Sequence, residues 1–432
     1  MAKKKEVELT PEERLQQALV PEEEWTYELP EGWKWYFFNG VVSEVKDRED
    51  IFKDVTVKYI GLENIAANYG IMSYQCAAGV KSTKTVFHTG DVLYGKLRPY
   101  LNKHDIANFS GVCSTDILVL RPSEFVDARY INYYLETSWF ITYAISNSKG
   151  INLPRVSPSA IGKACIPLPP IYVQKKITDF LDQEFARLDK TKEQIQSVID
   201  SAEERKQSIL FMAVTGKLSK KWRKKEGHSL TEWHTSSVRD SCKDIKVGIV
   251  IKPTRYYTDS NGIPAFRSAN VQEFHVQNSD WVYINQRGQD ENQRTIVHKD
   301  DVLIVRSGNP GTACVVPEKC DGYNAIDIII AVPNQEIINP EYLCIFTNSP
   351  KGRMQISSGI RGMALTHFNV GSYGKLEINI PPIDEQKEII SLVKKSLMEN
   401  DKATKMALRE LKAIYALKQS ILNKAFCGEL IR

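Results

Sequence analysis

The chain contains one sequence pattern twice, and this internal repeat constrains its fold more than any other feature. Residues 166–177 and residues 378–389 share an aliphatic run, a Pro-Pro pair and a Gln-Lys pair, and Ile166 aligns with Ile378, an offset of 212 residues. The same offset, without a gap, aligns three further blocks: Asp189-Lys190 with Asp401-Lys402, residues 206–210 with residues 418–422, and Gly216 with Gly428. A repeat of this length predicts two similar structural units in tandem.

Upstream of these blocks the offset between the copies becomes smaller. Aligned pairs are Asp116 with Asp327, Asp91 with Asp301, Asn64 with Asn270, and Trp33 with Trp233. Insertions therefore fall in the first part of each repeat and never in the last part. A region that tolerates insertions is rich in loops, whereas an ungapped block is typical of a rigid spacer.

The two ungapped blocks predict long helices. Each follows a Pro-Pro pair, contains no Pro or Gly, and ends at Gly216 or Gly428, as expected of a helix stop. Two seven-residue series run through each block. In the first they are Leu181, Leu188, Ile195, Ala202, Ile209 and Phe185, Lys192, Ile199, Lys206, Ala213; in the second, Val393, Asn400, Ala407, Ile414, Ile421 and Leu397, Thr404, Leu411, Lys418, Ala425. Heptads of this kind predict a coiled-coil seam in which the polar members set the register.

Two such seams in one chain most simply bury each other as an antiparallel pair, since the intervening residues reverse the chain direction. The alternative is that each helix packs on its own domain as an ordinary amphipathic helix. Five heptads are long for a helix of that kind, which favours the mutual pair. Apolar residues off the seam, including Phe180, Val198 and Phe211, are expected to pack on the globular parts or to bind a partner.

The two variable regions are predicted to be mixed α and β. Strands are expected at residues 55–60, 91–94, 116–120, 301–305 and 326–331, and helices at residues 130–135 and 341–346. Each region is large enough to bury its own core.

The composition excludes several classes of protein. Hydrophobic residues make up 42% and charged residues 25% of the 432 residues, which is typical of globular domains. No stretch approaches the roughly 20 consecutive apolar residues that cross a bilayer, and no apolar segment of a secretion signal follows the basic N-terminus. We therefore expect a cytoplasmic protein whose eight scattered cysteines are reduced and mostly buried.

Charge alone does not indicate a partner, because the net charge is only +4. One local concentration stands out: Lys217, Lys220, Lys221, Arg223, Lys224 and Lys225 lie close together without an acidic residue. The simplest interpretation of such a run is a solvated linker.

Catalytic signatures are absent from the sequence. It has no Walker A motif, no Gly-x-Gly-x-x-Gly after a strand, no Asn-Pro-Pro-aromatic signature of adenine methylation, and no His pattern of a metalloprotease or catalytic triad. No Cys or His spacing predicts a metal site. We therefore expect no catalytic residues, no metal and no cofactor in this chain.

The repeat, taken with its motifs, resembles the specificity subunit of Type I restriction-modification systems from about residue 12 to residue 432. The resemblance is carried by residues 29–33, by residues 90–101, and by the Pro-Pro-x-x-x-Gln motifs at residues 169–174 and 381–386. Residues 304–310 depart from residues 94–101, because Lys-Leu-Arg-Pro is not reproduced in the second copy. The family implies an α+β fold with two tandem mixed α/β target-recognition domains, each followed by a long helix. The two helices would form an antiparallel coiled coil with pseudo-two-fold symmetry.

The resemblance also implies the division of the chain and its function. The expected parts are an N-terminal helical segment (1–27), target-recognition domain 1 (28–170), spacer helix 1 (171–216), a basic linker (217–229), target-recognition domain 2 (230–382) and spacer helix 2 (383–428). Each domain would read one half of a bipartite, asymmetric double-stranded DNA target. The implied partners are two modification subunits, which carry S-adenosylmethionine and methylate adenine N6, and restriction subunits that translocate and cut DNA.

Two groups of side chains are candidates for contact with DNA: one is the cluster from Lys96 to Lys103 with the equivalent stretch at Arg306, and the other lies in predicted loops and has groove-compatible chemistry. They are Lys81, Lys84, Lys96, Arg98, Tyr100, Lys103, Asn152 and Arg155 in the first domain, and Arg306, Ser307, Asn309, Arg361, His367 and Asn369 in the second. A solvated surface side chain is the competing interpretation for each of them. Around Lys96 a structural role in the turn also stays open, because Gly95 and Pro99 restrict the backbone there.

Two other functions remain open at this point. The chain is itself a methyltransferase or nuclease with an atypical active site, or it is a coiled-coil adaptor that binds only proteins. Methyl transfer by the isolated polypeptide would favour the first alternative. Salt-dependent, sequence-selective DNA binding would exclude the second.

Overall fold

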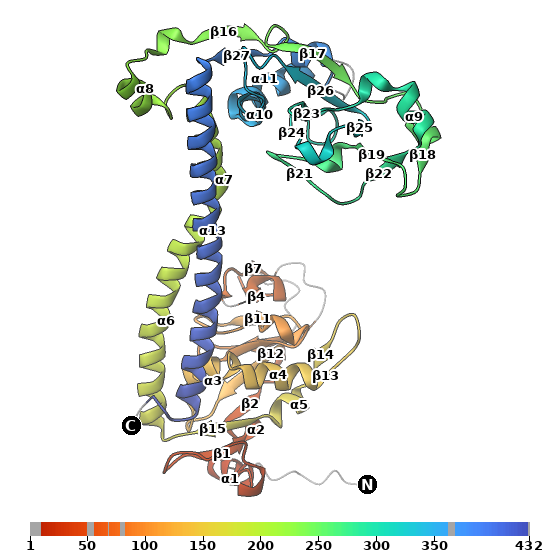
Figure 1. The fold of residues 1–432 in the computed structure, drawn as a ribbon. Helices are drawn as coiled ribbons and strands as arrows, with labels where there is room; N and C mark the ends of the chain where they lie inside the picture. The colour runs from red at the N-terminus through yellow and green to blue at the C-terminus, as the bar shows by residue number, and fades with distance from the viewer. Residues whose placement is uncertain (1–9, 50–55, 68, 78–82, 362–367, 431–432) are drawn as a thin grey trace. The chain divides into compact units, whose positions relative to one another are not determined.

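The computed structural model describes residues 10–49, 56–67, 69–77, 83–361 and 368–430. The chain divides into two compact units. Unit 1 consists of Met1–Ile195 and Arg409–Arg432, and unit 2 consists of Gln196–Leu408. Each unit therefore contains one variable region together with parts of both ungapped blocks (Figure 1).

Unit 1 is built on a four-stranded sheet in the order β10-β9-β12-β2 and a five-stranded sheet in the order β3-β8-β11-β4-β7. Its helices cover the four-stranded sheet and meet the long helices (Figure 1). The strands are β1 (Lys34–Phe37), β2 (Val42–Glu44), β3 (Arg48–Glu49), β4 (Lys58–Ile60), β5 (Ile65–Ala66), β6 (Gly70–Ile71), β7 (Gln75–Cys76), β8 (Lys84–Phe87), β9 (Val92–Gly95), β10 (His104–Ile106), β11 (Gly111–Cys113), β12 (Ile117–Pro122), β13 (Ser148–Lys149), β14 (Arg155–Val156) and β15 (Cys165–Leu168). The short helices are α1 (Pro11–Gln17), α2 (Phe38–Val41), α3 (Ala128–Leu135), α4 (Ser138–Ser146) and α5 (Pro158–Gly162).

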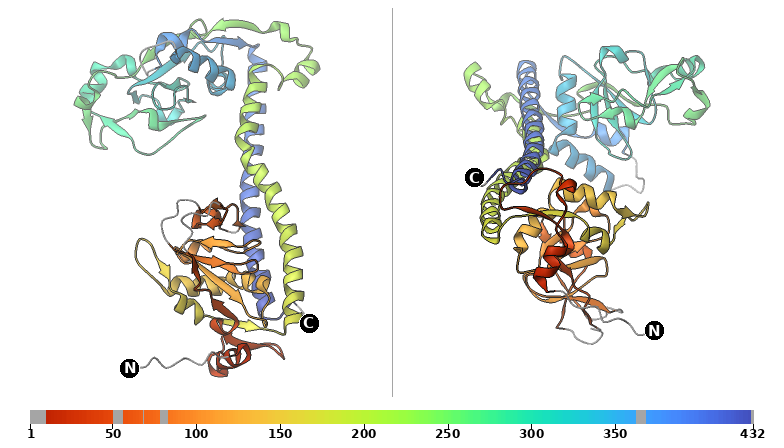
Figure 2. Two further views of the ribbon diagram at one scale, coloured as in Figure 1. Left: turned by 180° about the vertical axis from the view of Figure 1, so that it is seen from behind. Right: turned by 90° about the horizontal axis from the view of Figure 1, so that it is seen from below.

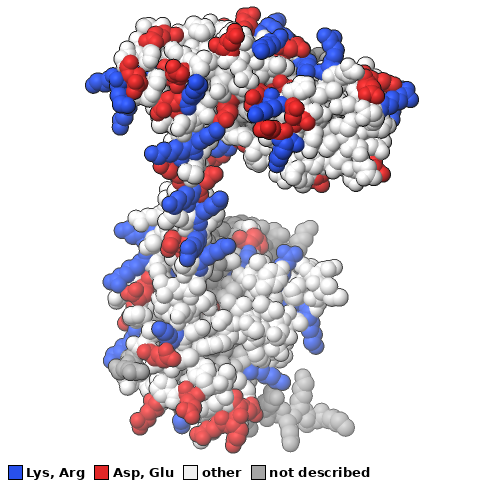
Figure 3. All heavy atoms as spheres, viewed as in Figure 1, with Lys and Arg blue, Asp and Glu red and all other residues white. Residues whose placement is uncertain are grey.

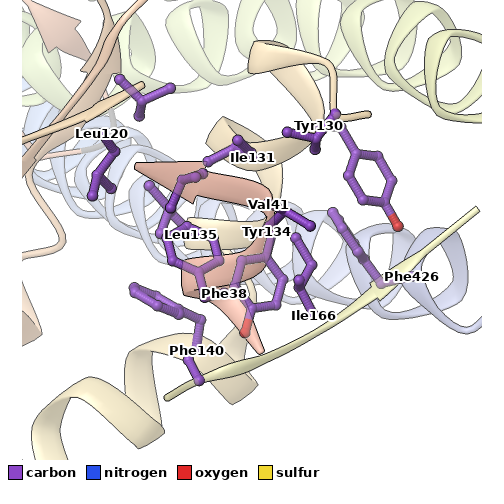
Figure 4. Close-up of a cluster of buried hydrophobic side chains, with 14 of the residues drawn as sticks. Phe38, Val41, Leu120, Tyr130, Ile131, Tyr134, Leu135, Phe140, Ile166 and Phe426 are labelled. Atoms are coloured by element: carbon purple, nitrogen blue, oxygen red, sulfur yellow. The ribbon is translucent and has the colours of Figure 1, made fainter. Parts of the chain in front are cut away.

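The core of unit 1 joins segments that are far apart in the sequence. Figure 4 shows Tyr130 and Tyr134 beside Phe426, which comes from the end of the last helix, and Phe38 and Phe140 pack against Tyr134. The ring centroids of Tyr130 and Phe426 lie 4.7 Å apart. Burial of an aromatic side chain of this size contributes about 2–3 kcal/mol, so the end of the last helix is bound firmly to the first variable region.

Unit 2 repeats this plan with other details. It has a four-stranded sheet in the order β17-β26-β23-β24 and a second one in the order β18-β22-β19-β25. The strands are β16 (His234–Ser237), β17 (Cys242–Val247), β18 (Tyr257–Thr258), β19 (Ile263–Phe266), β20 (Val271–Gln272), β21 (His275–Val276), β22 (Val282–Ile284), β23 (Val302–Val305), β24 (Ala313–Val315), β25 (Asn324–Ala325), β26 (Ile328–Pro333) and β27 (Glu377–Ile380). The short helices are α8 (Lys220–Glu226), α9 (Gln286–Glu291), α10 (Pro340–Asn348), α11 (Pro350–Arg361) and α12 (Val370–Gly374).

Equivalent strands of the two repeats pair in the same way. Trp33 and Trp233 each precede a strand that pairs antiparallel with the strand before the Pro-Pro motif, β1 with β15 and β16 with β27. One parallel pair occurs in each unit, β4 with β11 and β19 with β25. The predicted strands and helices are confirmed in type, but two strands are shorter than predicted: residues 56 and 57 form a turn before β4, and Asp327, with φ of 50°, precedes β26 and interrupts the predicted strand 326–331. Residue 55 lies outside the described residues.

Three long helices occupy the ungapped blocks: α6 (Ile171–Asp200), α7 (Ala202–Val214) and α13 (Ile383–Phe426). Every predicted seam position is buried or half-buried, and none is exposed. In unit 1 Lys418 pairs with Asp189 at 2.6 Å, and Lys192 lies 5.1 Å from the ring centroid of Tyr415. In unit 2 Arg205 pairs with Asn400. Partner numbers on α13 fall as those on α6 and α7 rise, so the helices are antiparallel (Figure 2).

Each unit buries the start of one long helix and the end of the other. In unit 1 these are residues from α6 and the end of α13, and in unit 2 they are residues from the start of α13 and from α7. The residues correspond at the offset of 212: Ile177 and Leu181 with Ile389 and Val393, Leu210 and Ala213 with Leu422 and Ala425. Because each unit buries helix segments from both ungapped blocks, the alternative in which each helix packs only on its own domain is excluded.

The first block differs from the prediction of one continuous rod, because Ser201 separates α6 from α7. Arg205 occupies the break. Its guanidinium donates to the Val198 carbonyl at 2.8 Å, to Ser201 Oγ at 2.5 Å and to Asn400 Oδ1 at 2.8 Å, while Asn400 donates to the Ala202 carbonyl at 3.1 Å. A side chain that enters the carbonyl ladder is a known cause of a helix break, and heptad spacing does not report it.

The predicted basic linker forms helix α8 and is only partly solvated. Five of its six cations are exposed, but Arg223 is buried and pairs with the buried Glu385 at the start of α13. Trp233 Nε1 donates to the second oxygen of Glu385 at 2.8 Å. The interpretation as a solvated linker therefore fails for Arg223, because its charge is neutralised inside unit 2.

No helix in the described part of the chain is both long enough and apolar enough to cross a membrane.

Candidate nucleic-acid interface

Two segments that carry candidate residues meet in unit 1. The first follows β9 and contains Lys96 and Arg98, and the second is the hairpin of β13 and β14, which contains Arg155. Backbone hydrogen bonds join them: Arg98 N–H donates to the Pro154 carbonyl at 2.7 Å, and Val156 N–H donates to the Lys96 carbonyl at 3.2 Å. Two predicted groups of candidates, about 50 residues apart in sequence, thus form one surface.

The geometry of this surface leaves cations available to a ligand. Arg98 is exposed and adopts a left-handed backbone with φ of 53°, a conformation that a non-glycine residue keeps only where its surroundings hold it. Arg155 pairs with Asp116 at 3.1 Å while its side chain stays 54% exposed. Tyr100 is also exposed. Arg98 and Arg155 provide charge-assisted donors suited to phosphates or base edges.

Two other candidates of the first domain have internal partners. Lys103 Nζ donates to the Leu62 carbonyl at 2.7 Å, so this ammonium group holds a loop of the domain. Lys84 lies in β8, with its Nζ 5.7 Å from the ring centroid of Tyr59. Asn152 is exposed at the tip of the hairpin, whereas Lys81 lies outside the described residues.

The corresponding segments also meet in unit 2. Arg306, which follows β23, donates from Nε to the Phe368 carbonyl at 3.1 Å, and Phe368 N–H donates back to the Arg306 carbonyl at 3.2 Å. Arg306 further pairs with Asp327 at 2.7 Å, and its side chain is only 16% exposed. It is therefore better placed to hold two loops together than to enter a groove.

The remaining candidates of the second domain flank this junction. Asn309 is exposed in the loop between β23 and β24, and Ser307 is half-buried beside it. Asn369 caps α12 by accepting from Ser372 N–H at 2.8 Å. Arg361 ends α11 and its side chain is not among the described ones, and His367 lies outside the described residues.

In each unit an aspartate pairs with an arginine of the candidate surface. Asp116 and Asp327 are equivalent residues just before β12 and β26, and each accepts an arginine of the candidate surface, Arg155 or Arg306. In the sequence, both aspartates serve only to align the repeats. The presence of an aspartate at this position in both copies was the sequence signal that these residues position the loops.

Burial makes the buried thiols of this chain poor nucleophiles. Burial raises the pKa of the Cys113 and Cys314 thiols to about 12, and both residues are inaccessible. None of the eight cysteines forms a disulfide; four are buried, three are half-buried and Cys76 is exposed, so the prediction of mostly buried thiols is confirmed in part. The described residues also contain no group of three or more His, Cys, Asp or Glu side chains arranged to hold a metal ion.

Comparison with known proteins gives the family. Residues 30–200 and 232–411 match the family described as the Type I restriction modification DNA specificity domain. The chain belongs to this family.

Named relatives agree with the family. The chain is 28% identical to the Type I restriction enzyme EcoKI specificity subunit of Escherichia coli K12 over 322 residues, which cover 72% of this chain and 68% of the relative. It is 27% identical to the StySPI specificity subunit of Salmonella potsdam over 322 residues, 72% of this chain and 67% of the relative.

Solved structures have the same fold. A chain from a study of complex assembly and conformational transition of the type I R-M system matches 93% of this chain and 100% of its own length, with a TM-score of 0.74 at 20% identity. The HsdS subunit from Thermoanaerobacter tengcongensis matches 94% of this chain and 99% of its own length, with a TM-score of 0.62 at 20% identity.

These findings decide between the three functions that the sequence left open. The chain is a Type I specificity subunit with two DNA specificity domains, and the predicted family and fold class are confirmed. A specificity subunit is not the catalytic polypeptide, so the methyltransferase or nuclease alternative is not favoured. An adaptor that binds only proteins is likewise excluded by a family of DNA specificity domains.

Proposed function

We propose that the two domains of this specificity subunit read the two unlike halves of one DNA target, which are separated by a spacer that neither domain reads. One observation carries the proposal. The two units share the frame that holds their loops, but the loops present different side chains: Arg98, Tyr100 and Arg155 in unit 1, and Ser307 and Asn309 beside a half-buried Arg306 in unit 2. Different groups on equivalent loops favour different bases, because base edges are read by matching donors, acceptors and methyl groups.

Phosphate contacts would fix the register of each domain on the duplex. Figure 3 shows Lys and Arg side chains on the visible face of both units and along the long helices. Of the predicted residues, Arg98, Tyr100, Asn152 and Arg155 form the best-supported reading surface in domain 1. Lys103 and Arg306 act instead as positioning residues, since both are bound to backbone carbonyls.

The partners follow from the family and from the exposed faces of the long helices. Modification subunits, two per chain, would supply S-adenosylmethionine and methylate adenine N6, and restriction subunits would translocate and cut DNA in the cytoplasm. Apolar side chains off the seam offer them a surface in each unit: Phe180, Tyr415 and Leu417 are exposed in unit 1, and Val198, Phe211, Met406 and Leu408 are exposed in unit 2. The exposed lysines of α8 would add to the surface of unit 2.

Mapping methylated adenines in cells that express this chain with its modification subunits tests the proposal. We expect one motif made of two different short sequences separated by a run of unspecified bases. Replacing residues 230–380 with the second domain of another family member should change one half of the motif and leave the other half intact. A continuous motif, or a change in both halves, would contradict the proposal.

A further inference from the structure

An apolar tip projects from the candidate surface of unit 1. Residues 150–154 connect β13 to β14, and within them Ile151 is 101% exposed and Leu153 is 48% exposed. Complete exposure of an isoleucine side chain gives no stability to the isolated chain, since no apolar surface is removed from water. Two exposed apolar side chains are too few to mark an interaction site by size alone, so the case for this tip depends on its surroundings.

The backbone holds the tip away from the body of the unit. Gly150 has φ of 105°, and a Cβ there would lie 3.1 Å from the Leu153 carbonyl oxygen, so the turn requires glycine. The base of the hairpin is paired through Ser148 with Val156 and Lys149 with Arg155. The hydrogen bond from Arg98 to the Pro154 carbonyl ties it to the neighbouring segment.

The pattern of the tip occurs in both repeats. At the offset of 212, Gly150, Ile151 and Leu153 align with Gly362, Met363 and Leu365. The last three residues lie outside the described part of the chain, so the correspondence is one of sequence only. The pattern of glycine, an apolar residue, any residue and leucine thus occurs at equivalent positions of two segments whose sequences otherwise differ.

The charge around the tip indicates its partner. Lys149, Arg98 and Arg155 are exposed beside it, and Asp116, which pairs with Arg155, is the carboxylate in contact with this group. Figure 3 shows blue and white atoms, without red, along the edge of unit 1 that bears the label β14 in Figure 1. An apolar tip between cations fits a polyanion that has apolar groups in a groove. Duplex DNA has this chemistry, because thymine carries a methyl group in the major groove.

We propose that the hairpin of β13 and β14 enters the major groove and that Ile151, supported by Leu153, reads thymine through its 5-methyl group. The inference rests on the proposed function and adds the chemical group that is recognised. A two-stranded β-ribbon fits the major groove, where the thymine methyl distinguishes A·T from the other base pairs. A half-site that contains an adenine for methylation necessarily contains a thymine opposite it.

The test uses the full-length chain assembled with its modification subunits and a duplex that carries the mapped target. The affinity is measured by fluorescence anisotropy for thymine DNA and for DNA with deoxyuridine in place of thymine, substituted in one half-site at a time. Deoxyuridine removes only the methyl group. We expect the wild-type complex to bind about fivefold more weakly when the half-site read by domain 1 carries deoxyuridine.

Variants at the tip separate methyl recognition from a general loss of binding. Ile151→Ala should bind thymine DNA about tenfold more weakly and should no longer respond to deoxyuridine. Ile151→Met, which retains an apolar chain, should bind like the wild type. Leu19→Ala removes an apolar side chain that is 41% exposed on a segment outside the hairpin, and should leave both affinities unchanged.

Two results would overturn the inference. One is an Ile151→Ala complex that binds like the wild type. The other is equal weakening on both duplexes while the wild type ignores deoxyuridine, the result expected if the tip separates base steps or contacts a protein. In either case a retained preference for the mapped sequence over a scrambled one leaves the proposed function intact, whereas a wild-type complex without that preference would refute the proposed function itself.

Discussion

Gln174 and Gln386 explain at the level of single residues why the Pro-Pro-x-x-x-Gln motif occurs twice. Both side chains are fully buried. Gln174 Nε2 donates to the Phe125 and Pro169 carbonyls, and its Oε1 accepts from Asp127 N–H; Gln386 makes the same three bonds with Ile337, Pro381 and Asn339. The glutamine therefore joins the first turn of the spacer helix to the domain before it.

Replacing Gln174 with alanine should lower the free energy of unfolding of unit 1 by about 3 kcal/mol, because two carbonyls and one N–H lose their partner inside the protein. Denaturant unfolding followed by tryptophan fluorescence measures the change. Gln196→Ala, which removes an exposed i,i+4 hydrogen bond to Asp200, is the matched control and should change it by less than about 0.5 kcal/mol. Equal effects of the two substitutions would show that the buried bonds do not anchor the helix.

Glu136 marks a place where the two copies differ. Burial raises the pKa of the Glu136 carboxyl to about 7, although the charge of Lys418 acts to lower this pKa. The equivalent residue at the offset of 212 is Asn348, which is buried and hydrogen-bonded to the Ala313 backbone. The second copy thus has a neutral side chain where the first has an ionisable one.

The stability of unit 1 should consequently fall as the pH rises from about 4.5 to about 7. Over this range the folded state binds more protons than the unfolded state, since the pKa is higher in the folded protein. Glu136→Gln should raise the thermal midpoint by about 3 °C or more at pH 8 and change it little at pH 4.5. Thermal unfolding at both pH values measures this, with the exposed Glu124→Gln as control. A shift that is the same at both pH values would exclude the carboxyl as its cause.

The long helices differ in construction at the level of elements. The second block forms one helix of 44 residues, α13, whereas the first is divided at Ser201. Asn400 stands in the seam opposite this break and exchanges hydrogen bonds with Arg205 and the Ala202 carbonyl. Its equivalent in the first block is the apolar Leu188, so this pair of amide hydrogen bonds has no counterpart at that position of unit 1. A polar seam position of this kind sets the register of paired helices at some cost in stability.

Removal of the guanidinium by Arg205→Ala should loosen the junction of α6 and α7. Without it the Val198 carbonyl and the Asn400 amide lose their partners, so amide hydrogens of residues 197–205 should exchange about tenfold faster in hydrogen–deuterium exchange. Arg187→Ala, which removes an exposed pair with Glu184, should leave the exchange of its own helix turn unchanged. Unaltered exchange at the junction would show that Ser201 alone sets the break.

At the level of the whole molecule, each unit is completed by a helix end from the other repeat. Phe426 closes the core of unit 1, and Val214, its equivalent at the offset of 212, belongs to the core of unit 2. The cores of both units thus depend on both ungapped blocks. This dependence accounts for the absence of insertions in the blocks, because one added residue would rotate every later seam position by about 100°.

Four residues inserted near Gln194 add about one turn and about 6 Å to one helix without a matching change in α13. We expect the target motif to change its spacer or to be lost, while both domains still fold. Mapping of methylated adenines gives the motif, and circular dichroism gives the folding. The same four residues inserted at the exposed turn at Gly227 serve as the control and should preserve the motif. An unchanged motif in the Gln194 variant would count against a spacer of defined length.

The sequence by itself determined the family, the tandem repeat, the mixed variable regions and the seam of the long helices. These features follow from local spacing. An ungapped offset and a seven-residue period can be read directly from the sequence, because equivalent seam positions of the two copies occupy equivalent places in the helix pair. Only the tertiary structure decided which candidates have free side chains. Lys103 and Arg306 are bound to backbone carbonyls of distant segments, Arg223 is neutralised by Glu385, and Arg98 is brought to the hairpin of Arg155. Such pairings depend on how the loops close around each sheet, and the loops are the part of this chain in which the two copies differ in length.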